Sequence, residues 1–283
     1  MITRKQGIPC VRKDMTPILR TAVTFLTLLL LVQLQLQAQS IFSAGETLRY
    51  KVRWSFIRLG TVEIRQCSLD PRNPAIRQFE MSVKSASGLP FIDLDFTQMT
   101  TATLDPLEVK TVTIDTRHGN QVKTTYWIES ATQQLIVTDS CQGAQIQCDT
   151  IAIAERCYEA LSLLLVARSY ASATKTMVIS TLVGGTVGET VLDFTGETEE
   201  IDVPALDDPV EAFHFSGDAR WVGRGFAGMK GKFKGWISRD AAAVPLRAEV
   251  GIFLGSIVLE LESIDRPNWR PSDTASSTLF RTR

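Results

Sequence analysis

The feature that most constrains this chain is a strict two-residue alternation of apolar and polar side chains. Between positions 47 and 56 every second residue is apolar: Leu48, Tyr50, Val52, Trp54 and Phe56. Successive side chains of a β-strand point to opposite faces of the sheet, so the pattern predicts a strand with one buried face. The alternation returns at 79–84 and 92–96, between breaks that contain glycine or proline. These hairpin signals predict an antiparallel meander.

One segment has a different period. Between 155 and 171, Cys157, Leu161, Leu164, Leu165 and Arg168 recur at spacings of three and four. This spacing predicts a helix over 155–171 whose apolar stripe packs on the sheet. Strand-like alternation resumes at 175 and continues to 264.

These patterns predict a mainly β fold, in which a curved antiparallel sheet is closed or nearly closed into a barrel. One helix is expected to pack against the barrel or inside it. A sheet of about ten strands with one apolar face tends to curl, and closure removes its exposed edges. A two-sheet sandwich is the alternative architecture.

The N-terminus predicts export. Five basic residues precede or flank a short apolar run over 21–32, which is followed by a glutamine-rich stretch ending near Ala38. A membrane-spanning helix needs about 20 apolar residues, so this run indicates a signal peptide over 1–38. An uncleaved signal anchor is the alternative, and the true start of the chain is Met1 or Met15. We expect an exported protein of the periplasm or cell envelope of a Gram-negative bacterium, with no transmembrane span in the mature chain.

The remaining sequence predicts one mainly β domain over 39–266 and a disordered, proline- and serine-rich tail over 267–283. Removal of 1–38 leaves 25 basic and 30 acidic residues, a net charge of −5. This charge argues against nucleic acid as a partner.

Four cysteines remain after removal of the signal peptide, which is an even number for an oxidising compartment. Cys141 and Cys148 are near enough in sequence to close a loop, so a disulfide between them is predicted. The remaining two, Cys67 and Cys157, would pair or stay buried. Free thiols throughout are the alternative.

No catalytic, metal or cofactor site is predicted. The chain has two histidines, His118 and His214, and neither lies near Ser162 or Asp240 in sequence. A nucleophile–base pair therefore cannot be assembled from the sequence, which argues against an enzyme without excluding one.

Three sequence blocks resemble an exported bacterial family, the domain of unknown function family three-one-zero-eight. The first block is Phe42-x-x-Gly45-Glu46-x-Leu48-x-Tyr50-x-Val52-x-Trp54, followed by Gly60. The second is Glu159-Ala160-Leu161-Ser162 leading to Arg168, and the third is Gly235-Trp236-Ile237-Ser238-x-Asp240, Pro245 and Gly255-Ser256. Glu159 stands where the family usually has aspartate, and Leu165 and Val166 stand where aromatic residues are usual. The resemblance implies an exported, mainly β protein and supplies no catalytic residue.

Two classes of function fit these observations. The first is a binding module that holds a lipid-like or other apolar ligand in the concavity of the sheet. The expected ligand contacts are Tyr50, Val52 and Trp54 on the first strand, with Leu161 and Leu165 on the helix. The second is a structural or assembly protein of the cell envelope with a filled core and no ligand. A cavity inside the fold favours the first, and packed aromatic side chains favour the second.

Overall fold

The computed structural model describes a set of segments that all lie within the unit Ser40–Arg283. The described residues are 41–67, 76–89, 93–103, 109–117, 120–129, 132–141, 143–153, 157–183, 185–221, 231–252, 255–267 and 269–270. The predicted signal peptide over 1–38 and nearly all of the predicted tail fall outside these residues.

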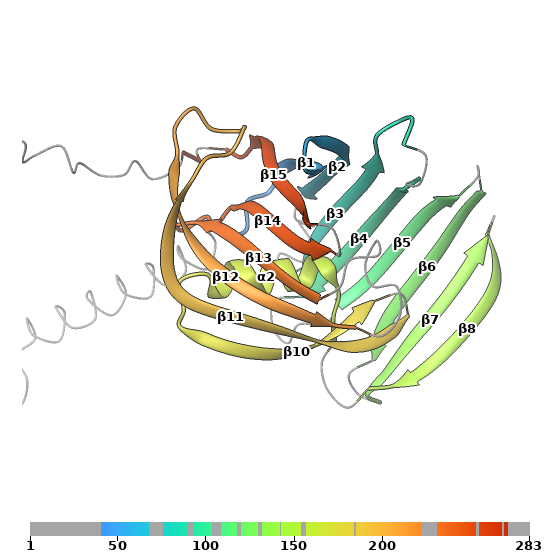
Figure 1. Ribbon diagram of the computed structural model, residues 1–283. Helices are drawn as coiled ribbons and strands as arrows, with labels where there is room; N and C mark the ends of the chain where they lie inside the picture. Colours follow the sequence, from blue (N-terminus) through green and yellow to red (C-terminus); the bar gives the residue numbers. More distant parts are fainter. Residues whose placement is uncertain are drawn as a thin grey trace, which may run out of the picture. The chain divides into compact units, whose positions relative to one another are not determined.

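The described strands form one sheet of 15 strands, more than the ten or so that the sequence pattern predicted (Figure 1). The first half of the chain makes successive antiparallel hairpins. Its strands are β1 (Thr47–Trp54), β2 (Ile57–Gln66), β3 (Ile76–Ser85), β4 (Asp95–Thr103), β5 (Val109–Arg117), β6 (Asn120–Glu129), β7 (Gln134–Cys141) and β8 (Ala144–Ala152). The predicted meander is therefore confirmed over this half.

The second half of the chain adds a short strand, a helix and a second meander. Its elements are β9 (Cys157–Tyr158), α2 (Ala160–Tyr170), β10 (Lys175–Val183), β11 (Thr186–Ile201), β12 (Val210–Arg220), β13 (Gly231–Ser238), β14 (Pro245–Ile252) and β15 (Gly255–Asp265). Strand β1 pairs with β15 and joins the two meanders at the centre of the sheet. The middle of the chain therefore supplies both ends of the sheet, β8 and β9.

The first strand follows the predicted alternation and ends earlier than predicted. Leu48 and Tyr50 are buried, with exposed fractions of 0% and 5%. Phe56, predicted to continue the buried face, is 91% exposed because the chain turns at Ser55 and Phe56. Ser55 has a positive φ of 52°, which reverses the chain so that β2 starts at Ile57.

The mainly β fold is confirmed. Of the two predicted forms, closed or nearly closed, full closure into a barrel is wrong, because no pairing joins β8 to β9 among the described residues. Side chains pack where the two ends of the sheet approach each other. This cluster contains Leu135, Val137, Ile153, Cys157 and Leu182. Hydrophobic contact therefore takes the place of the backbone hydrogen bonds that a closed barrel would need. The fold is mainly β, and its sheet is curved and open.

Helix α2 lies on the inner side of the curved sheet (Figure 1). It contacts β4 in one half of the sheet and β9 and β10 in the other. The helix begins at Ala160 rather than at 155, because the chain is still extended in β9 and Glu159 forms the N-cap. No helix in the described part of the chain is long and apolar enough to cross a membrane.

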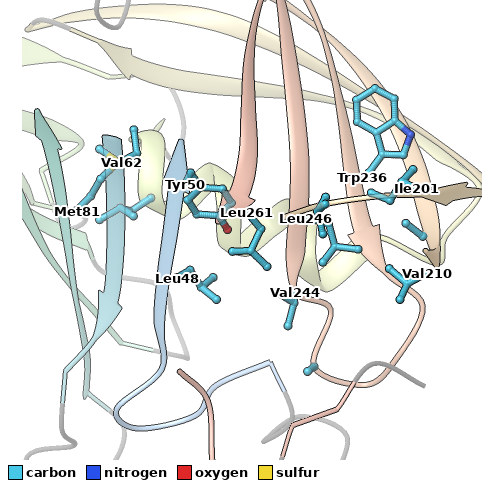
Figure 2. Close-up of a cluster of buried hydrophobic side chains, with 14 of the residues drawn as sticks. Leu48, Tyr50, Val62, Met81, Ile201, Val210, Trp236, Val244, Leu246 and Leu261 are labelled. Atoms are coloured by element: carbon cyan, nitrogen blue, oxygen red, sulfur yellow. The ribbon is translucent and has the colours of Figure 1, made fainter. Parts of the chain in front are cut away.

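The main core lies between α2 and the centre of the sheet. Leu161 of the helix, 2% exposed, belongs to the same cluster as Leu48, Leu246 and Leu261, all at 0%. Figure 2 shows the side chains of Leu48, Leu246 and Leu261 gathered with those of neighbouring strands. The inner face of the sheet and one face of the helix are therefore buried together.

Candidate functional site

A cavity of about 480 Å³ lies between the N-terminal part of α2 and the strands β1–β3, β14 and β15. Its lining is mostly apolar. The residues are Tyr50, Val52, Leu59, Gly60, Thr61, Val62, Ile64, Met81, Val83, Lys84, Ser85, Asp93, Leu94, Ala160, Leu164, Pro245, Arg247, Ala248, Ile257 and Leu259. The volume falls in the range of about 300–1,000 Å³ that is usual for small-molecule sites. The charged residues in the lining are Lys84, Asp93 and Arg247.

Gly60 shapes one wall of the cavity. It lies on β2 opposite Val52 of β1 and Ser85 of β3. A Cβ at this position would lie 2.2 Å from the main-chain oxygen of Lys84. Only glycine therefore allows β2 and β3 to approach this closely. This close approach is the physical reason for Gly60, the glycine that follows the first of the three sequence blocks.

The structure brings two of the five predicted ligand contacts to the cavity. Tyr50 and Val52 line it, whereas Trp54, at the end of β1, is not among its lining residues. The helix lines the cavity with Ala160 and Leu164, each one position before the predicted Leu161 and Leu165. Leu161 is buried in the core, and Leu165 packs against that core. One residue along a helix rotates the side chain by about 100°, so the predicted pair lies beside the cavity wall.

A buried ion cluster anchors the helix beside the cavity. Arg168 of α2 makes a bidentate contact with Glu46, with Nη1 2.7 Å from Oε1 and Nη2 3.1 Å from Oε2. Arg266 also pairs with Glu46. The side chains of Glu46 and Arg168 are each 3% exposed. A bidentate guanidinium–carboxylate pair fixes orientation as well as distance, so this contact defines the position of the helix.

The ion cluster also reaches the third sequence block. Arg168 Nη2 donates a hydrogen bond to the main-chain oxygen of Ala242 at 2.9 Å. Tyr50, in the cavity wall, donates from its hydroxyl to the main-chain oxygen of Pro245 at 2.9 Å. The three blocks that are far apart in sequence therefore meet around Arg168. Sequence reasoning assigned no partner to Glu46 and missed this cluster, although Arg168, a charge inside an apolar helical segment, was an available signal.

A second buried carboxylate caps the helix. Glu159 accepts hydrogen bonds from the main-chain nitrogens of Leu161 and Ser162 at 2.8 and 2.9 Å. It also accepts from Ser162 Oγ at 2.7 Å, from Thr100 Oγ1 at 3.1 Å and from Gln98. Burial raises the pKa of Glu159 despite these donors. Ser162 is thus a capping partner, 1% exposed, and the arrangement holds the helix against β4.

Another carboxylate, Glu260 of β15, lies among basic residues of β1. Lys51 Nζ is 3.2 Å from Glu260 Oε2, and Arg53 Nη2 is 2.8 Å from Oε1. Hydrogen bonding from Arg53 is the main cause that lowers the pKa of Glu260 to about 2, against the desolvation that would raise it. The folded state therefore binds this proton more weakly than the unfolded chain does.

This difference predicts a pH dependence of stability. The contribution of Glu260 is present above its unfolded pKa of about 4.3 and is lost as the pH falls toward about 2. Urea unfolding between pH 6 and pH 2.5 should show the free energy of unfolding falling through this window. Glu260→Gln should reduce the slope of the free energy of unfolding against pH in this window. An unchanged slope in the variant would contradict the assignment.

In the described part of the chain, the four cysteines Cys67, Cys141, Cys148 and Cys157 form no disulfide. The predicted Cys141–Cys148 bridge is not formed, because Cys148 of β8 pairs with Thr138 and Cys141 of β7 pairs with Ala144. This register separates the two cysteines by three positions along the strands, or about 10 Å. A disulfide needs Cα atoms within about 7 Å, so the two strands would have to slip to form one.

Comparison with solved structures supports the fold. The chain resembles a β-barrel-like protein of domain of unknown function DUF1849 from Brucella abortus, with a TM-score of 0.53 and 9% identity over 80% of this chain and 99% of that one. It also matches a protein with YmcC-like fold from Bacteroides fragilis at a TM-score of 0.32 and 9% identity, over 79% and 96% of the two chains. At 9% identity, the likeness to the Brucella abortus protein concerns the fold alone.

Comparison with curated protein sequences finds no match. A family model described as "protein of unknown function (DUF3108)" matches residues 49–262. This segment runs from β1 to β15 and includes the cavity lining, the capping residue Glu159 and Arg168. The chain belongs to the DUF3108 family of proteins of unknown function.

Proposed function

We propose that this protein is an exported binding module that holds a lipid-like or other apolar ligand in the cavity between α2 and the sheet. Export rests on the signal peptide predicted over 1–38, which would deliver the domain to the periplasm or cell envelope of a Gram-negative bacterium. The observation that carries the binding proposal is the 480 Å³ cavity with its largely apolar lining. A site of this kind favours ligands through burial of apolar surface.

The proposed contacts come from both the sheet and the helix. Tyr50 and Val52 would contact the ligand from β1, and Ala160 and Leu164 would contact it from α2. Trp54, Leu161 and Leu165, which the sequence suggested, would support the wall from outside the lining. The hydroxyl of Tyr50 donates to the oxygen of Pro245, so the phenol ring is held in place before a ligand binds.

Filling the cavity should abolish binding. Ala248 lies on β14 and lines the cavity, so Ala248→Phe would place a ring where the ligand is expected. We expect binding of a fatty acid that carries a dansyl fluorophore to weaken about tenfold or more, measured by fluorescence titration. The matched control is Ala144→Phe on β8, an exposed position outside the lining.

Two results would contradict the proposal. One is equal affinity of the probe for Ala248→Phe and the unchanged protein, with both folded by circular dichroism. The other is native mass spectrometry of protein purified from its own cell envelope that shows no bound lipid, combined with no binding of the probe. The structural or assembly role without a ligand would then replace the binding role.

A further inference from the structure

The hairpin that joins β1 and β2 carries an exposed aromatic side chain at its tip. Phe56 is 91% exposed, more than any other large apolar residue in the described part of the chain. The positive φ of Ser55 places the turn here, between Trp54 at the end of β1 and Ile57 at the start of β2. A single exposed apolar residue is common on protein surfaces, so the surroundings of Phe56 decide whether it has a role.

A second exposed apolar residue lies on the neighbouring hairpin. Strand β15 lies between β1 and β14 in the sheet (Figure 1). Ile257 of β15 is opposite Trp54, and a Cβ on Gly255 would lie 3.8 Å from Trp54 Nε1. Ile252, which pairs with Gly255 and ends β14, is 36% exposed. The tips of the two hairpins therefore lie at the same end of the sheet, and each presents an apolar side chain to water.

The β1–β2 hairpin is also strongly basic. Residues 47–66 contain five basic residues and one acidic residue, a net charge of +4 in a chain whose net charge is −1. Arg53 and Arg58 are opposite each other in the hairpin next to its tip, and their side chains are 33% and 50% exposed. They pair with Glu260 and Glu262 of β15, and these two carboxylates lower the net charge of the hairpin and its partners to +2. A positively charged surface therefore lies directly behind the aromatic tip.

The cavity opens toward these tips. At its deep end the lining residues Tyr50 and Met81 are each 5% exposed. Leu59 and Ile257 line it within three positions of the two tips and are half-buried, and the lining residue Asp93 is exposed. An apolar ligand would therefore enter the cavity past the exposed side chains of the hairpins.

We infer that the tips of these two hairpins dock on an anionic lipid bilayer and hold the mouth of the cavity against it. The inference rests on the proposed function, because the bilayer is then the source of the apolar ligand. Phe56 and Ile252 bury apolar surface among the lipid headgroups, and Arg53 and Arg58 lie near the lipid phosphates. A ligand then passes from the bilayer into the cavity without crossing water.

The charge of the hairpin selects this occupant. Anionic lipids attract basic residues to the membrane surface, and each such residue strengthens binding about fivefold. A bilayer also takes up an aromatic ring without a preformed pocket, because the burial of apolar surface is non-directional. Without residues 1–38 the chain has a net charge of −5, so an anionic surface repels the rest of the protein and orients it with this hairpin forward.

Vesicle flotation of the purified protein tests the docking. We expect binding to vesicles that contain phosphatidylglycerol and much weaker binding to vesicles of phosphatidylcholine alone. Phe56→Ser removes the ring at the tip, and we expect the partition coefficient to fall about tenfold. The matched control Ile146→Ser removes an apolar side chain of β8 that is 63% exposed, and it should leave binding unchanged.

Arg58→Gln tests the electrostatic part of the docking. The variant removes one charge next to the tip, so binding to phosphatidylglycerol vesicles should weaken about fivefold and depend less on salt. The control Lys175→Gln removes the same charge from an exposed position on β10, outside the hairpin, and should have little effect. Three outcomes would overturn the inference: no vesicle binding, equal binding to both kinds of vesicle, or equal effects of each variant and its control.

Docking and ligand binding fail separately in these experiments. Phe56 is not among the lining residues, so Phe56→Ser should keep the affinity of the cavity for the dansyl fatty acid in the absence of vesicles. Loss of that affinity would show that Phe56 acts on the cavity rather than on the bilayer, against the inference. Vesicle binding by a protein that takes up no probe would overturn the proposed function and retain the docking.

Discussion

Replacing Glu46 with glutamine is expected to lower the free energy of unfolding by about 3–5 kcal/mol. The carboxylate of Glu46 contacts Arg168 and Arg266, whose side chains are 3% and 7% exposed. A neutral amide would remove the negative charge that Glu46 presents to the buried guanidinium groups of Arg168 and Arg266, and breaking a buried ion pair from one side is strongly destabilising. Urea unfolding followed by circular dichroism measures the change.

The matched control for this variant is Glu262→Gln. Glu262 of β15 pairs with Arg58 at 2.7 Å, with side chains that are 30% and 50% exposed. Ion pairs in contact with water contribute about 0–1 kcal/mol, so the control should cost much less. Equal effects of the two variants would show that the buried cluster does not anchor α2 as the geometry indicates.

Replacing Leu161 with aspartate is the second large effect that we expect. Leu161 is 2% exposed in the main core, and its truncation alone would cost about 2–5 kcal/mol. Aspartate adds the burial of a carboxylate without a partner, so the protein should lose at least this much stability or fail to accumulate. Thermal unfolding, or soluble yield if the variant does not fold, gives the result.

A substitution on the exposed part of the same helix separates burial from helix propensity. Ser169→Asp introduces the same side chain near the end of α2 at an exposed position. We expect a loss of about 1 kcal/mol or less there, from propensity and the helix dipole. A melting temperature unchanged by Leu161→Asp would mean that the helix does not pack on the sheet.

Local patterns in the sequence predicted most of the secondary structure. Alternation around Leu48 and Tyr50 predicted β1 and its buried face, because strand geometry requires a period of two. Apolar spacings of three and four predicted α2, with a start five residues too early. The error arose because Cys157 lies in β9 and pairs with Ser180 of β10, a contact that no local pattern encodes.

The open edge and the cavity could not be predicted in this way. Whether β8 meets β9 depends on the curvature accumulated over 15 strands and on the helix placed between the two halves. Alternation indicates which side chains face inward, and it does not indicate whether they fill the interior. Tyr50 and Val52 were therefore predicted as inward residues, while the choice of Ala160 and Leu164 over Leu161 and Leu165 depended on how the helix is rotated.

By itself, the sequence determined the meander, a helix within 155–171 and the family membership that its three blocks indicate. These properties depend on side chains within a few positions of one another. Only the tertiary structure decided that Glu46 and Arg168, 122 residues apart, form one buried pair beside the cavity. It also showed that the middle of the chain supplies the edges of an open sheet. Such contacts depend on the folded path of the whole chain, because residues distant in sequence become neighbours only when the sheet curves around the helix.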